Sequence, residues 1–187
     1  MIFLLLACTS GGDTAVALDC TELMASEGTV EEHLEGVQRH LYPSLDGVPV
    51  ELHRDLTSDQ DFFTAAPDLT TLDERPRTYR VRTNVAIDTL GVPVEGIVAI
   101  LAHELKHVLD YTEMTDVEVV DFGLWYGQGD IAEYERATDL GSLERGCGEG
   151  LIAYRDWLYS VVDADTLDAK KRDYMTPDEI RAWMENR

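Results

Sequence analysis

The sequence predicts an α+β fold, a mostly helical domain with a short β-sheet packed on one central helix. Three observations lead to this prediction. The 187 residues are enough for one domain with a single core. Residues 78–87 alternate apolar and polar side chains as a half-buried strand does, whereas most other segments repeat apolar residues at helical spacing. Residues 94–111 are apolar nearly all round, which is typical of a buried helix.

A first helix is expected over residues 27–45. Thr29 is suited to be its N-cap, and Glu32 completes a capping box. His33 and His40 are seven residues apart and therefore share one face of this helix. We interpret both as surface histidines.

The sheet is expected to be small. Residues 47–53 predict a short strand, in which Pro49 favours an edge position. The polar residues 57–77 predict a long loop with a helical turn at 59–64, and long loops are often functional. The strand at 78–87 follows and ends shortly before the central helix.

The second half of the chain is expected to be helical, with glycine-rich breaks. The predicted helices cover residues 94–111, 115–126, 130–145 and 151–162, and a short last helix begins at 177. Asp130 is the expected N-cap of the third helix in this series. Thr176 and Glu179 frame a capping box around Pro177, which suits a first turn.

The central helix carries the motif His103-Glu104-Leu105-Lys106-His107. The two histidines lie one turn apart on the same face. Two imidazoles and a carboxylate in a buried helix are costly unless something satisfies them, and a divalent metal ion does so. In the H-E-x-x-H arrangement the histidines bind zinc and the glutamate acts on the metal-bound water. The alternative is two core histidines at a coincidental spacing.

A catalytic zinc site needs a third protein ligand. No histidine follows His107, which excludes the pattern with a third histidine soon after the motif, so a carboxylate must serve. Glu133 stands three residues after Asp130, where a capping-box glutamate reaches back to the helix start. Glu135 has Asp139 one turn further on, where it could orient a metal-bound histidine. We favour Glu135 over Glu133, with a solvated acidic helix face as the alternative to both.

His103-Glu104-x-x-His107 followed by Glu135-x-x-x-Asp139 resembles the gluzincin clan of zinc metallopeptidases. The resemblance covers roughly the middle third of the chain. It implies a zincin-like domain in which the two histidines and the later glutamate hold zinc and the aspartate orients a histidine.

The same resemblance implies an upstream edge strand, here residues 78–87, that binds a peptide substrate in extended form. The chain departs from the thermolysin pattern at Tyr134, where thermolysin has an asparagine before the ligand. It is also too short for the helical second lobe of thermolysin, so the domain would be a minimal version.

The activity that the resemblance implies is hydrolysis of a peptide or protein substrate. Zinc polarises the scissile carbonyl, and Glu104 acts as general base. A donor for the developing oxyanion is also expected. Our candidates are Tyr154 and Arg155, followed by Tyr111 and Tyr126.

The rival interpretation is a non-catalytic protein that uses the same scaffold to bind a partner. The intact Glu104 argues against it, because a purely structural zinc site has no use for a base and usually has four protein ligands.

The chain is strongly acidic, with 37 Asp and Glu against 15 Lys and Arg and a net charge of -22. Such a surface repels phosphate backbones and anionic lipid head groups. Nucleic acid is therefore not an expected partner.

Residues 1–8 form an apolar run whose end, Leu5-Leu6-Ala7-Cys8, resembles the lipobox of bacterial lipoproteins. The resemblance implies lipidation of Cys8, export to the bacterial cell envelope and attachment to a membrane through the lipid alone. Residues 9–20 would then be a tether and residues 21–187 the folded domain. The alternative is an apolar N-terminal segment buried in the fold.

The cysteine count agrees with export. If Cys8 carries lipid, Cys20 and Cys147 remain as a possible disulfide in an oxidising compartment. The alternative is two free buried thiols.

Overall fold

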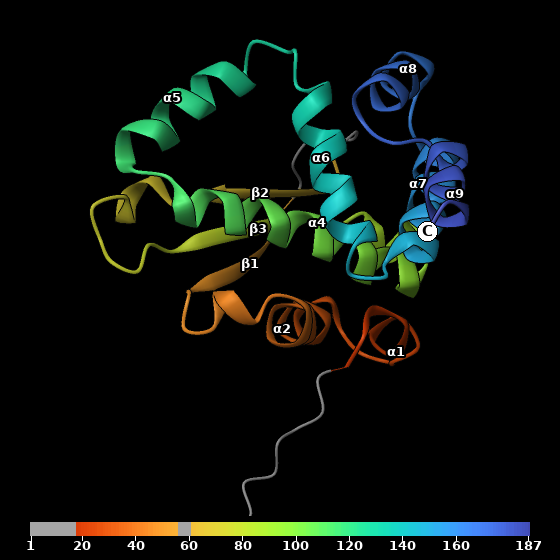
Figure 1. The fold of residues 1–187 in the computed structure, drawn as a ribbon, viewed down its shortest axis with the longest axis horizontal. Coiled ribbons are helices and arrows are strands. Elements are labelled where there is room, and N and C mark those ends of the chain that lie inside the picture. Colours follow the sequence, from red (N-terminus) through yellow and green to blue (C-terminus); the bar gives the residue numbers. More distant parts are fainter. Residues whose placement is uncertain (1–17, 56–60) are drawn as a thin grey trace, which may run out of the picture.

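The computed structural model describes residues 18–55 and 61–187. Within them, the fold combines helices with a small three-stranded sheet, which confirms the α+β prediction (Figure 1). Cys8 and most of the predicted tether lie outside the described residues, as does the start of the helical turn predicted at 59–64.

The first half of the chain contains short helices and the three strands. The elements are α1 (Cys20–Met24), α2 (Val30–Leu41), η1 (Pro43–Leu45), β1 (Val50–Asp55), β2 (Phe63–Pro67), η2 (Leu69–Thr71), β3 (Tyr79–Asn84) and α3 (Ile87–Leu90). The capping box of Thr29 and Glu32 at the start of α2 is present as predicted.

The two histidines of α2 are not surface residues, so that prediction was wrong. His33 is 4% exposed because it shares the apolar face of Val30, Leu34 and Val37, and this helix packs on the central helix. His40 is half-buried and accepts a hydrogen bond from the backbone N–H of Leu18 at 3.2 Å.

The sheet has the order β1-β3-β2. β1 is parallel to β3, whereas β2 is antiparallel to it, so that Val81 pairs with Leu52 on one side and Ala65 on the other. β3 is therefore the central strand, and the prediction of an edge strand at 78–87 was wrong. The edge beside the central helix is β2, in a segment that we had expected to be a loop.

The second half consists of helices. They are α4 (Val94–Glu113), α5 (Asp116–Tyr126), α6 (Ala132–Leu143), α7 (Gly148–Val161), α8 (Ala164–Asp173) and α9 (Pro177–Glu185). α8 was not predicted, whereas the capping box of Thr176 and Glu179 is present. Asp130 does not cap α6, because its N-cap position is Ile131, which makes no side-chain cap hydrogen bond.

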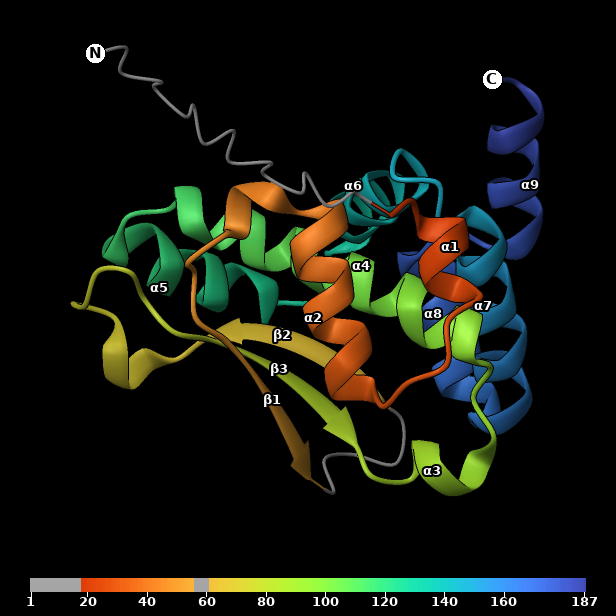
Figure 2. The same ribbon diagram turned by 90° about the horizontal axis from the view of Figure 1, so that it is seen from below.

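α4 is the buried centre of the molecule, as predicted. Figures 1 and 2 show it running through the middle, with α1 and α2 on one side and α6 on the other. Its fully buried residues include Val98, Leu101, Leu105 and Val108. Because α4 is fixed by packing on almost every side, the side chains that it presents are held on a rigid support.

Two glycines allow α7 to lie very close to α4. A Cβ atom on Gly150 would lie 2.4 Å from the carbonyl oxygen of Glu95, and one on Gly96 would lie 3.2 Å from the backbone of Tyr154. A side chain at either position would push the two helices apart. Gly148 and Gly150, which we had expected in a break before the helix, belong to α7, so this helix begins three residues earlier than expected.

A disulfide joins Cys20 at the start of α1 to Cys147 just before α7. It is the pair that the cysteine count predicted. Among the described residues, none of the helices has the length and apolar character needed to cross a bilayer.

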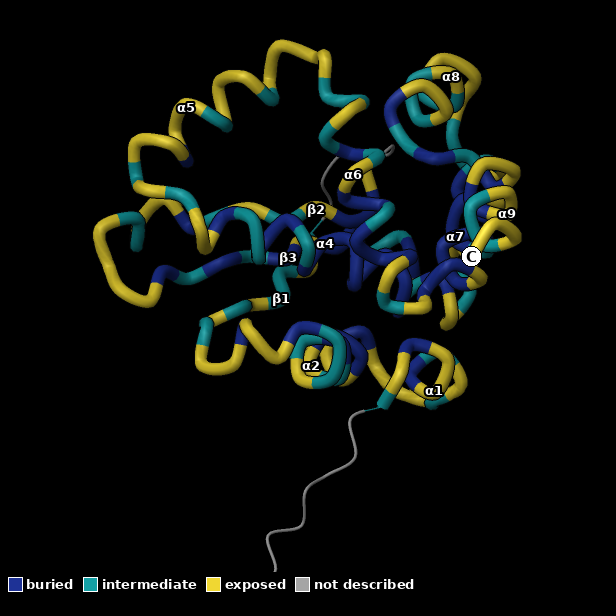
Figure 3. The backbone as a smooth tube through the Cα atoms, viewed as in Figure 1, coloured by how far each residue is buried: buried dark blue, intermediate teal, exposed yellow. Residues whose placement is uncertain are grey.

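Among the helices that lie near α4, α5 is the most exposed. Figure 3 shows most of its length in the exposed colour, and Val119 is its one buried residue. Several of its large apolar side chains are exposed, namely Val117, Val120, Leu124 and Trp125. The helix therefore stands away from the core and forms one wall of a cavity described below.

Candidate metal centre and its cavity

Three ligand atoms converge beside α4. His103 Nε2 lies 3.1 Å from His107 Nε2 and 3.1 Å from Oε2 of Glu135, which α6 provides. The third distance, from His107 Nε2 to the same oxygen, is 3.4 Å. All three residues are buried and together form a group that could hold a metal ion. The structure therefore brings together the two motif histidines and the favoured third ligand, whereas Glu133 is exposed on α6.

The size of this triangle fits a tetrahedral zinc ion. Zinc binds nitrogen and oxygen at about 2.0–2.1 Å, which places two ligands of a tetrahedron about 3.3–3.4 Å apart. The three observed separations of 3.1, 3.1 and 3.4 Å are close to this value. Three protein ligands also leave the fourth tetrahedral position open, as catalytic zinc sites do.

Hydrogen bonds behind the triangle fix the orientation of each ligand. Asp139 accepts a hydrogen bond from His103 Nδ1 at 2.8 Å, so Nε2 of that ring is turned toward the triangle. Nδ1 of His107 lies 2.9 Å from the hydroxyl of Tyr134. The hydroxyl of Tyr126 donates to Oε1 of Glu135 at 2.5 Å, which leaves the other oxygen for the ion.

Asp139 is itself held by two further groups. Nη2 of Arg155 lies 2.9 Å from Oδ1, and the backbone N–H of Met175 donates to Oδ2 at 2.8 Å. Arg155 is 2% exposed and Asp139 is fully buried, so this is a buried ion pair. Arg155 thus supports the ligand shell and is poorly placed for the oxyanion role that we considered for it.

The charges of the group favour a cation. Burial alone would lower the pKa of His103, but hydrogen bonds to Asp139 and Glu135 outweigh it and raise the pKa to about 10. Burial would raise the pKa of Glu135, yet the two histidines hold it far below its usual value. Without a metal ion, the His103 ring therefore binds a second proton, which a metal ion would displace.

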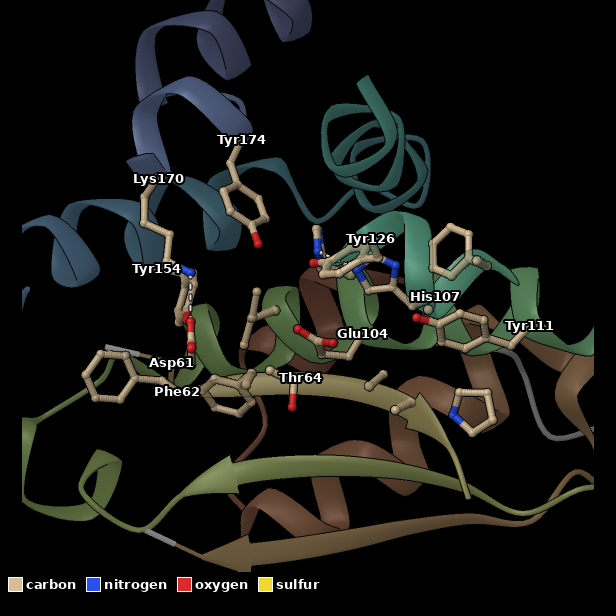
Figure 4. A pocket seen from close by; sticks show the side chains of 18 of the residues that line it. Asp61, Phe62, Thr64, Glu104, His107, Tyr111, Tyr126, Tyr154, Lys170 and Tyr174 are labelled. Carbon is tan, nitrogen blue, oxygen red and sulfur yellow. Dashed lines mark hydrogen bonds and ion pairs between the residues drawn. The ribbon is translucent and has the colours of Figure 1, made fainter. Parts of the chain in front are cut away.

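Glu104 lies beside the triangle and does not belong to it. Its side chain is 4% exposed and points into the cavity (Figure 4). Burial raises its pKa, and the nearby His103 and His107 offset part of the increase. A buried carboxylate with a raised pKa, next to a candidate metal centre, is suited to proton transfer.

The open side of the site faces a cavity of about 450 Å³. One wall is the whole of β2 with the residues around it, and the opposite walls come from α5 and from the region of α7 and α8. Most of the lining is apolar or aromatic, and the polar groups are gathered around Glu104 and at one end.

The other predicted oxyanion donors differ in their surroundings. Tyr154 and Tyr111 line the cavity. Within residues 18–55 and 61–187, neither hydroxyl has a hydrogen-bond partner. Tyr126 also lines it, but its hydroxyl is engaged with Glu135. Tyr154 and Tyr111 are therefore better placed than Tyr126 or Arg155 to donate to a bound molecule.

Sequence reasoning missed three contributors to the site: Tyr134, Tyr174 and β2. The ring of Tyr174 lies 5.9 Å from that of His103, between centroids, and lines the cavity. Tyr134 precedes the ligand Glu135 in the sequence, so its position on α6 was a usable signal. Nothing local marks Tyr174, because it reaches the site only through the turn that follows α8.

Comparison of the chain with protein-family models, with curated proteins and with solved structures finds no match.

Proposed function

We propose that this protein is a zinc-dependent peptidase. The observation that carries the proposal is the triangle of two histidine nitrogens and one carboxylate oxygen, open toward a cavity in which Glu104 lies beside it. Zinc is the metal that fits this donor set and these separations best. When bound, it would polarise the scissile carbonyl and lower the pKa of water. This is also the reaction implied by the gluzincin resemblance.

Glu104 is the general base in this proposal. It takes a proton from the attacking water and delivers it to the leaving amine. Its burial supports this role, because a carboxylate whose pKa is raised holds a proton more readily than an exposed one.

Tyr174 is our first choice as donor to the oxyanion. Its ring lies near His103, and its hydroxyl points into the cavity (Figure 4). The guanidinium carbon of Arg155 lies 4.5 Å from the ring centroid, which holds the ring in place. Burial raises the pKa of the Tyr174 phenol, so the hydroxyl stays protonated and able to donate.

β2 takes the substrate-binding role that we had expected of residues 78–87. It lines the cavity and is an edge strand among the described residues, so it can offer the backbone groups of its outer edge to an extended peptide. A peptide paired with β2 would pass between the strand and Glu104.

The test is the variant Glu104→Gln, with Glu113→Gln on the exposed end of the same helix as its control. Glu104→Gln should keep its zinc and its fold but lose at least about 10²-fold in chelator-sensitive hydrolysis of casein, because the amide cannot accept the proton. Glu113→Gln should behave as wild type. Unchanged hydrolysis by Glu104→Gln contradicts the role given to this residue. A fully zinc-loaded wild type that cleaves nothing favours the rival, a non-catalytic partner-binding protein.

We also propose that the protein is exported and lipid-anchored through Cys8. The disulfide between Cys20 and Cys147 supports export, since such bonds persist in oxidising compartments. A palmitate analogue should label the wild type in a bacterial host and not Cys8→Ser. Equal labelling of both contradicts the anchor.

A further inference from the structure

One end of the cavity holds two hydrogen-bond donors that the proposed reaction does not use, Tyr154 and Lys170, beside the carboxylate of Asp61. Figure 4 shows Asp61, Tyr154 and Lys170 gathered there, on the far side of Glu104 from Tyr111. All of them line the cavity. Lys170 comes from α8, Tyr154 from α7, and Asp61 lies just before β2, so three separate elements meet at this end.

Tyr154 and Lys170 can each donate further hydrogen bonds to a bound molecule. No described residue makes a hydrogen bond to the hydroxyl of Tyr154, and burial raises the pKa of this phenol, which keeps it protonated. Lys170 has three N–H groups, and its one hydrogen-bond partner in the described part of the chain is Asp61, at 3.1 Å. The Lys170 ammonium also lies 5.3 Å from the ring centroid of Tyr174, so its position is constrained.

The ion pair between Lys170 and Asp61 does not prevent Lys170 from binding a second carboxylate. The Asp61 side chain is 50% exposed, whereas that of Lys170 is 20% exposed. Ion pairs with such an exposed member contribute little, because water solvates the carboxylate nearly as well as the lysine does. A second carboxylate in the cavity can therefore join Lys170 or displace Asp61 at low cost.

The direction of β2 determines which part of a peptide reaches this end. β2 begins at Phe63, two residues after Asp61, and its arrow in Figure 4 runs from the Asp61 end of the cavity toward Tyr111. A peptide added in the antiparallel sense, which is the more stable pairing, runs the opposite way. Its C-terminal part then points toward Asp61, Tyr154 and Lys170.

We infer that Lys170 and Tyr154 bind a carboxylate of the substrate on the C-terminal side of the cleaved bond. The inference rests on the proposed peptidase function and deepens it. The carboxylate has two possible sources, the C-terminus of the peptide or an acidic side chain. In the first case the protein removes short C-terminal fragments, and in the second it cuts before acidic residues.

The experiment uses two decapeptide libraries that contain the same set of sequences. The peptides of one library end in a free carboxylate, and those of the other end in an amide. The measured quantity is the ratio of kcat/KM between acid and amide forms, with cleavage positions read by mass spectrometry. We expect a ratio of about 10 to 100, since a hydrogen-bonded charge is worth about that factor. If cleavage instead follows glutamate and aspartate positions in both libraries, the source is an acidic side chain.

The variants isolate Lys170. Lys170→Met should bring the preference for the carboxylate close to 1, while Lys171→Met should keep it. Lys171 is the matched control because it is exposed and lies 5.3 Å from the ring centroid of Tyr159, away from the cavity lining. Asp61→Asn removes the competing carboxylate and should raise the preference, an effect that a merely structural role of the pair would not produce.

A binding measurement keeps this test separate from that of the peptidase activity. Calorimetry on zinc-loaded Glu104→Gln compares N-acetyl-Ala-Phe-Leu with its C-terminal amide, and a glutamate-containing amide serves as the second arm. Tighter binding of a carboxylate form, lost in the double variant with Lys170→Met, supports the subsite even if no peptide is cleaved. Equal binding and equal cleavage of all forms, or a preference that Lys170→Met leaves unchanged, overturns it.

Discussion

Replacing Asp139 by asparagine tests how much the groups behind the candidate metal site contribute. In the wild type the Asp139 carboxylate accepts hydrogen bonds from His103 at 2.8 Å, from Arg155 at 2.9 Å and from the backbone of Met175 at 2.8 Å. Asparagine has almost the same shape but carries no charge. The buried guanidinium of Arg155 would therefore lose its counter-ion.

The expected effect on stability is large. Breaking a buried ion pair by removing one partner costs about 3–5 kcal/mol, against a total free energy of unfolding of about 5–15 kcal/mol for a domain. The metal site should weaken as well, because loss of the partner of a metal-bound histidine lowers metal affinity about 10–100-fold. Urea unfolding of the metal-free protein measures the first quantity, and competition with a zinc chelator measures the second.

Asp156→Asn is the control for this experiment. The Asp156 side chain is 58% exposed, and its contact with Arg181 is 3.7 Å long. An exposed pair of this kind contributes less than about 1 kcal/mol. If Asp139→Asn unfolds at the same urea concentration as Asp156→Asn and binds zinc as tightly as wild type, Asp139 has neither role.

Three further predictions concern the ligands and the disulfide. Glu135→Ala should lose the bound zinc, measured by atomic absorption, while the exposed Glu133→Ala keeps it; the reverse result would make Glu133 the ligand. The pKa of His103 is raised from 6.5 to about 10 in the metal-free fold, so its protonated ring stabilises the fold fully below pH 6.5, and this contribution disappears as the pH rises through 10. The metal-free melting temperature should accordingly fall over that range, and zinc binding should release about one proton; a flat profile without proton release contradicts this. Replacing Cys20 and Cys147 together by serine should cost about 2–5 kcal/mol in urea unfolding, and no change would show that the bridge is not needed for stability.

The parts of the fold that could be predicted from sequence are those with a local cause. The capping boxes at Thr29 and Thr176 depend on residues three positions apart, and both are present. α4 was predictable because its apolar surface is nearly continuous. In contrast, β2 has the sequence FTAAP, and its pairing with β3 and its packing against α4 make it a strand.

The same distinction holds for the site. His103, Glu104 and His107 are defined by spacing on one helix. The absence of a later histidine pointed to a carboxylate ligand, and Asp139 one turn further on favoured Glu135 over Glu133. The position of Tyr174, in contrast, depends on contacts between distant elements. The position of Tyr174 could not be predicted, because sequence periodicity carries no information about such contacts. His33 could have been, since it lies three residues after Val30 and four before Val37, on the apolar face of its helix.

The disulfide has a consequence for a protein proposed to cut peptides. The stretch of chain between Cys20 and Cys147 spans 127 positions and contains the three candidate ligands and Glu104. A single self-inflicted cut anywhere inside this covalent ring leaves both pieces joined through sulfur. A molecule cut in this way would therefore run as one band on a non-reducing gel and as two bands after reduction. The disulfide would also keep the pieces that carry the candidate ligands in one molecule.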